Sequence, residues 1–277
     1  MNPSLLEAIV LGIVQGLAEF LPISSSGHLI LVPWLLGWQE HGLTFDLALH
    51  LGTSAALLGY FWRDWVKLIQ VVAVGIFSKP ARLFPEWKLA WLILLGCLPA
   101  GIIGVVFEAQ IEALFRQPVL IAVMLIGFGL LMLAADRLGS QKRSLSGIGP
   151  GVTLMDAVVI GCAQVLALMP GVSRSGITLT AGLFRGLDRG SAARFSFLLS
   201  APITIAAALY KLRDLVKAPP SGGELLVFAA GVVAAGIVGA LAIGFLLKYL
   251  QRKPVDVFVW YRVAAGLLIL ALVFVGR

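Results

Sequence analysis

The sequence predicts an all-α polytopic membrane protein with six transmembrane helices and two re-entrant helical hairpins, arranged as an inverted-topology repeat. The first observation is composition: of 277 residues, 60% are hydrophobic and 13% are charged, and the mean hydropathy is +0.99. Soluble domains are about 45–50% apolar and about 25% charged. This apolar excess cannot be buried in one soluble core, so we expect it to face lipid.

Six apolar runs are long enough, or nearly so, to cross about 30 Å of hydrocarbon. They are expected at about 43–62, 88–107, 118–136, 191–210, 224–247 and 257–275. Two further apolar segments, 4–37 and 152–185, are interrupted at their centres by Pro, Gly and Ser clusters. Irregular backbone at membrane depth persists only where protein or a polar cavity satisfies its N–H and C=O groups. We therefore interpret these two segments as re-entrant hairpins.

The two halves of the chain resemble each other, which predicts a single membrane domain over 1–277 built from the repeats 1–140 and 150–277. One constant shift places Gln15 on Gln164 and Ser24 on Ser173 without a gap. Each half then holds one hairpin and three spans. Because three is an odd number of membrane crossings, the second half starts on the opposite side of the membrane and is inverted relative to the first. Inverted repeats with broken helices usually place their site near the midplane, at the repeat interface.

Loop charge predicts the orientation, because cytoplasmic loops carry an excess of Lys and Arg. The basic residues at 63–88, 137–143, 185–194 and 248–253 fall on one side, whereas Arg116, those at 211–217 and Arg277 fall on the other. Both termini and the first hairpin are then expected on the outer face, and the site is expected to open there. The net charge of +7 follows the same membrane pattern, so no nucleic-acid partner is expected.

Glu19 is an acidic residue inside an apolar stretch, four residues after Gln15. Positions i and i+4 share one face of a helix. A charge at membrane depth costs roughly 2.5–3.5 kcal/mol or more, so it is a functional candidate by default. The alternative is a structural carboxylate that is hydrogen-bonded to a neighbouring broken helix.

A serine cluster follows, and it predicts the start of a second half-helix. The cluster consists of Ser24, Ser25, Ser26 and Gly27. Serines before an apolar run are typical N-caps, and a helix N-terminus favours phosphate through its unpaired N–H groups and dipole. His28 follows Ser25 by three residues and can share its face, which favours a catalytic role beside the serines. The alternatives are plain capping for any single serine and a structural role for His28.

The second hairpin supplies a cation at the matching place, namely Arg174, between Ser173 and Ser175 and followed by Gly176 and Thr178. A planar guanidinium suits phosphate oxygens. Two helix N-termini, one cation, one carboxylate, hydroxyls and a histidine would converge, which is enough for phosphoryl chemistry. The competing interpretation is a purely structural Glu19–Arg174 ion pair across the repeat axis.

Two motifs resemble those of the undecaprenyl-diphosphatase family, also called the bacitracin-resistance protein family. Residues 15–19 (Gln-Gly-Leu-Ala-Glu) resemble its (E/Q)xxxE motif, and residues 170–178 (Pro-Gly-Val-Ser-Arg-Ser-Gly-Ile-Thr) resemble its PGxSRSxxT motif. The similarity covers essentially the whole chain. It implies a bacterial inner-membrane phosphatase that recycles the lipid carrier of peptidoglycan synthesis by hydrolysing undecaprenyl diphosphate.

The resemblance also implies dependence on a divalent metal, Mg²⁺ or Ca²⁺. It carries active-site roles over to Glu19, Ser25, His28, Ser173, Arg174, Ser175 and Thr178. Position 15 is Gln where many members have Glu, so this pair keeps one carboxylate. We expect the metal at Glu19 and Gln15, with Gln15 binding through its amide oxygen; the alternative is that Gln15 only positions water.

The resulting hypothesis assigns catalysis to Glu19, Ser25, His28 and Arg174. Ser25 attacks the terminal phosphorus with His28 as base or acid, and water then releases phosphate. In the alternative without a covalent step, His28 or Glu19 activates water directly. Substrate binding is expected from Gln15, Ser24, Ser26, Gly27, Ser173, Ser175, Gly176 and Thr178.

Two other functions fit parts of the pattern. A transporter or flippase of an anionic prenyl lipid would use Arg174 and the helix dipoles, but it has no need of a nucleophile and a histidine. A purely structural scaffold leaves the costly polar groups at membrane depth unexplained. The small residues Gly96, Ala100 and Gly104 permit close helix packing, including a homodimer.

Overall fold

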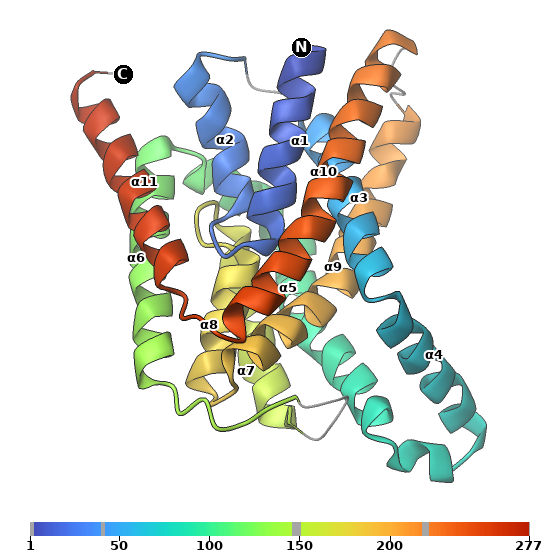
Figure 1. Ribbon diagram of the computed structural model, residues 1–277. Helices are drawn as coiled ribbons and strands as arrows, with labels where there is room; N and C mark the ends of the chain where they lie inside the picture. The colour runs from blue at the N-terminus through green and yellow to red at the C-terminus, as the bar shows by residue number, and fades with distance from the viewer. Residues whose placement is uncertain (1–2, 40–41, 146–150, 218–221, 277) are drawn as a thin grey trace.

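The computed structural model describes residues 3–39, 42–145, 151–217 and 222–276, and in these ranges the chain is mainly helical (Figure 1). The helices of the first half are α1 (Leu5–Phe20), α2 (Ser25–Leu36), α3 (Leu43–Tyr60), α4 (Trp62–Phe77), η1 (Pro80–Leu83), α5 (Pro85–Phe115) and α6 (Pro118–Leu138). Those of the second half are α7 (Leu154–Gln164), η2 (Val165–Leu168), α8 (Arg174–Phe184), α9 (Arg189–Lys217), α10 (Gly222–Leu250) and α11 (Asp256–Phe274).

Five helices in the described part of the chain are long and apolar enough to cross a membrane, so the chain is a multi-pass membrane protein. They lie at Pro85–Phe107, Pro118–Leu138, Arg189–Ala207, Glu224–Leu250 and Asp256–Phe274. These five match predicted runs. The sixth predicted run forms α3, which is not among the five because Asp46, His50 and its hydroxyl residues lower its hydropathy.

The two interrupted segments form helix pairs whose tips meet near the centre of the molecule (Figure 1). The pair α1 and α2 lies in the upper half, and the pair α7 and α8 lies in the lower half. The helices α1 and α7 both begin with a capping box, Ser4 with Glu7 and Thr153 with Asp156. In α1 the helix stops before Pro22, which disfavours helical geometry at the preceding residue.

The starts of α2 and α8 repeat one unusual geometry. Ser24 has φ 79° and Ser173 has φ 73°, a left-handed region that non-glycine residues rarely adopt. Each serine hydroxyl accepts a hydrogen bond from the backbone N–H three residues later, at Gly27 and Gly176. The alignment of the two halves thus has a direct counterpart in local structure.

Small residues let the hairpins pack closely against the long helices. A Cβ on Gly12 of α1 would lie 2.5 Å from the carbonyl oxygen of Gly231 in α10. Likewise, a Cβ on Gly161 of α7 would lie 2.5 Å from the carbonyl oxygen of Gly96 in α5. The face of α5 that carries Gly96 and the buried Ala100 therefore packs against α7 of the same chain. A homodimer stays a prediction, and this stripe is not free to form it.

The segment 62–77 was expected among the loops that carry basic residues, and this expectation is wrong. It forms α4, which packs against α5. Leu68 is buried, and Trp65 and Val72 pack against the same core from one face of α4. Apolar residues at this spacing form one helical stripe, so Arg63 and Lys67 lie on a helix rather than in a loop.

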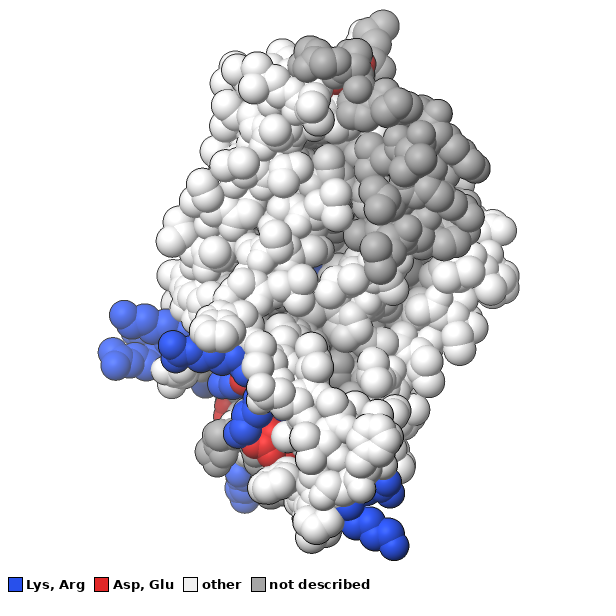
Figure 2. Space-filling model, turned by 90° about the vertical axis from the view of Figure 1, so that its right-hand side faces the viewer, with Lys and Arg blue, Asp and Glu red and all other residues white. Residues whose placement is uncertain are grey.

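Basic side chains gather at one end of the molecule (Figure 2), whereas both ends of the described chain lie at the opposite end (Figure 1). Buried carboxylates anchor several of these cations, as in the Asp136–Arg189 and Asp156–Arg185 pairs. The predicted difference in charge between the two ends stays a prediction, because four of the five cations expected at the opposite end are not described. Arg277 and the side chains of Lys211, Arg213 and Lys217 lie outside the described residues.

Replacing Asp156 by Asn is expected to lower the free energy of unfolding by about 3 kcal/mol, because it removes the buried partner of two arginines. The Asp156 side chain is fully buried and accepts hydrogen bonds from Arg143 and Arg185. Thermal unfolding in detergent measures the change. In the control Asp64→Asn the partner is Arg194, whose side chain is 38% exposed, so the loss should stay below about 1 kcal/mol. Equal shifts in the two variants would contradict the prediction.

Candidate active site

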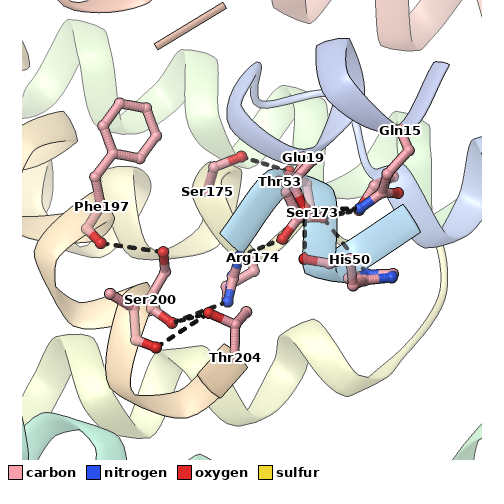
Figure 3. Close-up of polar contacts among 12 residues, drawn as sticks. Gln15, Glu19, His50, Thr53, Ser173, Arg174, Ser175, Phe197, Ser200 and Thr204 are labelled. Carbon is pink, nitrogen blue, oxygen red and sulfur yellow. Dashed lines mark hydrogen bonds and ion pairs between the residues drawn. The ribbon is translucent and has the colours of Figure 1, made fainter. Parts of the chain in front are cut away.

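Glu19 lies at the meeting point of the two hairpins (Figure 3). It is in the last turn of α1, is 8% exposed, and forms an ion pair through Oε1 with Arg174 at the start of α8. Its other oxygen, Oε2, accepts a hydrogen bond from Ser25 Oγ at 2.6 Å and one from Gln15 Nε2 at 3.1 Å. A buried carboxylate is thus in contact with a hydroxyl from one hairpin and a cation from the other.

Local geometry explains how Ser25 reaches Glu19. The chain leaves α1 at Leu21 in an extended conformation and turns back at Ser24 with positive φ. This turn starts α2 directly beside the end of α1, with Ser25 as its first residue. The first N–H groups of a helix have no intrahelical partner, so the start of α2 offers donors next to the Ser25 hydroxyl.

Cross-hairpin hydrogen bonds hold the two tips together. The hydroxyl of Ser24 accepts from Gly171 N at 3.1 Å, and the hydroxyl of Ser175 donates to Leu21 O at 3.2 Å. Within these groups Ser26 Oγ lies 3.5 Å from Ser24 Oγ, and Ser173 Oγ lies 3.2 Å from Ser175 Oγ. Most of the predicted serines are therefore assembled at one place, and several of their hydroxyls brace the loops.

Thr178 was predicted to bind substrate, and the structure places it one turn into α8, behind Arg174. Its hydroxyl donates to Arg174 O at 2.7 Å and lies 2.5 Å from Ser196 Oγ of α9. The side chain is 1% exposed. Thr178 therefore anchors the start of α8 to α9 and does not line an open surface in this structure.

The Arg174 guanidinium lies between two acceptors. One nitrogen pairs with Glu19, and Nη1 donates to Ser200 O of α9 at 3.4 Å (Figure 3). Thr204 Oγ1 donates to the same carbonyl oxygen at 2.8 Å. Pro202 interrupts the hydrogen bonding of α9 nearby, because proline has no N–H to donate. Arg174 is thereby fixed against the carboxylate that also contacts Ser25, with 17% of its side chain exposed.

His28 was expected beside Ser25, but its ring is engaged elsewhere. Its Nδ1 lies 2.8 Å from Ser24 O, and its Nε2 lies 2.7 Å from the hydroxyl of Tyr261 in α11. The two rings are stacked, with centroids 5.6 Å apart. Since both ring nitrogens have these partners, the group in contact with Ser25 is the Glu19 carboxylate rather than His28.

His50 was not predicted, yet it lies at the same carboxylate. Its Nε2 is 3.7 Å from Glu19 Oε2, while its Nδ1 lies 2.8 Å from Asp46 O in α3. Thr53, also in α3, lies 3.5 Å from Gln15 Nε2. An ionisable residue inside a predicted span was the available signal, because such residues mark functional sites.

Comparison of the sequence with known proteins identifies the family of this chain. Residues 8–268 match the family model of the bacitracin resistance protein BacA. The chain belongs to this family. Curated relatives include the undecaprenyl-diphosphatases of Moorella thermoacetica, 48% identical over 99% of this chain and 100% of the relative, and of Geobacter metallireducens, 50% identical over 99% of each chain. The undecaprenyl-diphosphatase of Trichlorobacter lovleyi is 50% identical over 98% of each chain.

A divalent metal is implied for BacA proteins by the sequence resemblance, so the donor atoms near Glu19 are relevant. Among the described residues no group of three or more His, Cys, Asp or Glu side chains could enclose a metal. However, Gln15 Oε1 is buried and has no hydrogen-bond partner, and Gln15 contacts the Glu19 carboxylate. One oxygen of the Glu19 carboxylate together with Gln15 Oε1 fits Mg²⁺, which usually takes one or two protein ligands and completes its shell with water and substrate phosphate.

A second residue without a predicted role is Arg262 of α11, which is fully buried. In the sequence it stands as a single cation within the apolar run 257–275. In this BacA-family chain it contacts the loops that precede both Ser25 and Arg174. Its partners become apparent only in the folded structure, because they are distant in sequence.

Replacing Tyr261 by Phe is expected to lower turnover by less than about 10-fold, since it removes one hydrogen bond worth about 1 kcal/mol and keeps the ring stack. Phosphate release and thermal unfolding measure the two effects. The control is Tyr60→Phe, because Tyr60 is 45% exposed and lies on α3 away from His28. Complete inactivation of a folded Tyr261→Phe protein would show that the His28–Tyr261 pair takes part in the chemistry itself.

Proposed function

We propose that this chain hydrolyses undecaprenyl diphosphate to undecaprenyl phosphate and inorganic phosphate. This reaction recycles the lipid carrier for peptidoglycan and other cell-wall polymers and confers bacitracin resistance. The observation that carries the proposal is the contact of Ser25 with Glu19, whose second oxygen is paired with Arg174. A hydroxyl, a base and a phosphate-binding cation are the parts that a phosphatase needs. Full-length relatives named undecaprenyl-diphosphatase support the substrate.

The chain is proposed to lie in the bacterial inner membrane with six spans and two re-entrant hairpins, the second half inverted relative to the first. The basic end is cytoplasmic and the opposite end faces the periplasm. The gathering of Lys and Arg at one end supports this orientation (Figure 2). The first hairpin descends from the end that carries both termini (Figure 1), so the site opens to the periplasmic face.

In the proposed mechanism, Arg174 and the free N–H groups at the starts of α2 and α8 bind the oxygens of the terminal phosphate. Ser25 Oγ attacks the terminal phosphorus while Glu19 Oε2, 2.6 Å away, accepts its proton. The bond from this phosphorus to the bridging oxygen breaks, and undecaprenyl phosphate leaves with the bond electrons. Glu19 gives this proton to the leaving oxygen of undecaprenyl phosphate and is a carboxylate again. Water then attacks the phosphoserine while Glu19 accepts a proton from it, the bond from phosphorus to Ser25 Oγ breaks, and Glu19 returns the proton to Ser25 Oγ as phosphate is released.

A divalent cation, Mg²⁺ or Ca²⁺, would be held by the Glu19 carboxylate and Gln15 Oε1, and it would neutralise charge that develops on the phosphate oxygens. His50 Nε2 lies 3.7 Å from the same Glu19 oxygen that Ser25 contacts, and its side chain is 33% exposed, so it can contact a phosphate that approaches Glu19. The covalent mechanism forms a phosphoserine at Ser25, whereas the mechanism with direct attack by water does not. Acid quenching during the first turnover, followed by mass analysis, detects phosphate on Ser25 only in the covalent version.

The proposal is tested by phosphate release from undecaprenyl diphosphate by detergent-purified protein, with Mg²⁺ and with EDTA. We expect steady release with Mg²⁺ and loss of release with EDTA. No release by well-folded protein would favour the alternative, a transporter of an anionic prenyl lipid. That alternative uses Arg174 and the helix dipoles but leaves the Ser25–Glu19 contact without a purpose.

A further inference from the structure

We infer that Arg262 is a positioning residue, which fixes the spacing between Ser25 and Arg174 by binding the backbone of both hairpin tips. Its guanidinium is 0% exposed and lies between α11, α6 and the two loops. It donates to five carbonyl oxygens, those of Pro22 (3.1 Å), Met124 (3.4 Å), Leu125 (3.0 Å), Gly171 (3.0 Å) and Val172 (3.1 Å).

Three of these five partners lie in the loops just before Ser25 and Arg174. Pro22 is in the loop that leads into Ser25, and Gly171 and Val172 are in the loop that leads into Arg174. Carbonyl groups of irregular backbone at membrane depth are costly unless protein satisfies them. Arg262 satisfies three of them with one rigid group, so the positions of the two loops become dependent on each other.

The backbone conformation of the two loops shows why these hydrogen bonds are needed. Ser24 and Ser173 both have positive φ, and strained conformations of this kind persist only where the surroundings over-determine them. The surroundings here include the bond from Gly171 N to Ser24 Oγ and the five carbonyl bonds of Arg262. Lysine cannot replace this arrangement, because a planar fork with five donors is needed rather than a single ammonium group.

Two glycines leave room for the guanidinium. A Cβ on Gly176 would lie 3.0 Å from Arg262 Nη1, and a Cβ on Gly129 would lie 3.3 Å from Arg262 Cβ and 3.4 Å from its Nε. Gly127, on the same helix α6, faces open space, with no atom within 4 Å of an added Cβ. Alanine at position 129 therefore displaces the Arg262 side chain, whereas alanine at position 127 leaves it in place.

The inference rests on the proposed function, and its test compares Arg262→Lys and Gly129→Ala with two matched controls. The controls are Arg189→Lys, which weakens a two-bond ion pair with Asp136 away from the site, and Gly127→Ala. Misplacement of reacting groups by about 1 Å costs about 10²-fold in rate. We expect Arg262→Lys to lower kcat by about 10–10²-fold with KM within about threefold, because Arg174 still binds the phosphate.

Gly129→Ala is expected to lower kcat several-fold, whereas both controls keep kcat even where their melting temperature falls. A folded Arg262→Lys protein with wild-type kcat, or one in which only KM rises, would overturn the inference. If Arg262→Lys does not fold, equal kcat values for Gly129→Ala and Gly127→Ala overturn it.

Amide hydrogen exchange provides a readout that does not need turnover. Arg262→Lys should speed exchange in peptides covering both loops, residues 21–25 and 170–174, whereas Arg189→Lys should not. Unchanged exchange in both loops would overturn the inference. Absence of turnover in the wild type would instead count against the proposed function, so the two failures are distinguishable.

Discussion

Glu19→Gln is expected to lower kcat for phosphate release by about 10³-fold, because the amide cannot accept the proton of Ser25. The variant keeps the size of the side chain and one oxygen, so the chain should still fold. Ser25 Oγ lies 2.6 Å from the carboxylate, and in the described chain no other carboxylate contacts this hydroxyl. Steady-state phosphate release with undecaprenyl diphosphate measures the loss, and thermal unfolding checks the fold.

Glu86 provides the matched control for Glu19. It is also a buried glutamate, 6% exposed, but it pairs with Lys67 of α4 at the basic end of the molecule. Glu86→Gln should therefore change stability and leave kcat near the wild-type value. If Glu19→Gln kept kcat within a few-fold and lost only stability, Glu19 would be a structural ion-pair partner and not the base.

Arg174→Lys is expected to lower kcat/KM by about 10²–10³-fold, since lysine keeps the charge and loses the planar fork. Arg174 must bind Glu19 and Ser200 O while it also binds phosphate, and a single ammonium cannot match these directions. Kinetics of phosphate release measure the effect. Arg194→Lys is the control, because Arg194 pairs with Asp64 and is 38% exposed, so kcat/KM should stay close to wild type.

A charge exchange separates catalysis from structure at the same pair. The double variant Glu19→Arg with Arg174→Glu keeps one cation and one carboxylate facing each other across the hairpins. If the pair is only structural, the exchange should restore both folding and turnover. We expect restored stability relative to the single variants without turnover, because the base and the phosphate-binding cation have changed places.

The sequence predicted the parts of the fold that depend on local pattern. Long apolar runs predicted the five described helices that are long and apolar enough to cross a membrane, and the Pro-Gly-Ser interruptions predicted the breaks before α2 and α8. The helix α4 was missed because charged residues near its start were interpreted as a loop. Its apolar stripe, which packs on α5, was present in the sequence.

The site was predicted to the extent that rare polar residues stand out in apolar sequence. Glu19, Ser25 and Arg174 do so, and the structure brings them into contact. The partner of His28 could not be predicted, because it depends on the approach of Tyr261 from a helix more than two hundred positions away in sequence. The contacts of His50 and Arg262 depend on helix packing in the same way.

The rate of phosphate release by Ser25→Ala, measured beside Ser54→Ala, shows most directly whether Ser25 is the nucleophile. Ser54 is a suitable control because its buried hydroxyl, on α3, has no hydrogen-bond partner. We expect Ser25→Ala to lose at least about 10³-fold in kcat at wild-type stability, whereas Ser54→Ala keeps kcat. Ser25→Ala turning over within a few-fold of the wild type would contradict the assignment of Ser25 as the nucleophile.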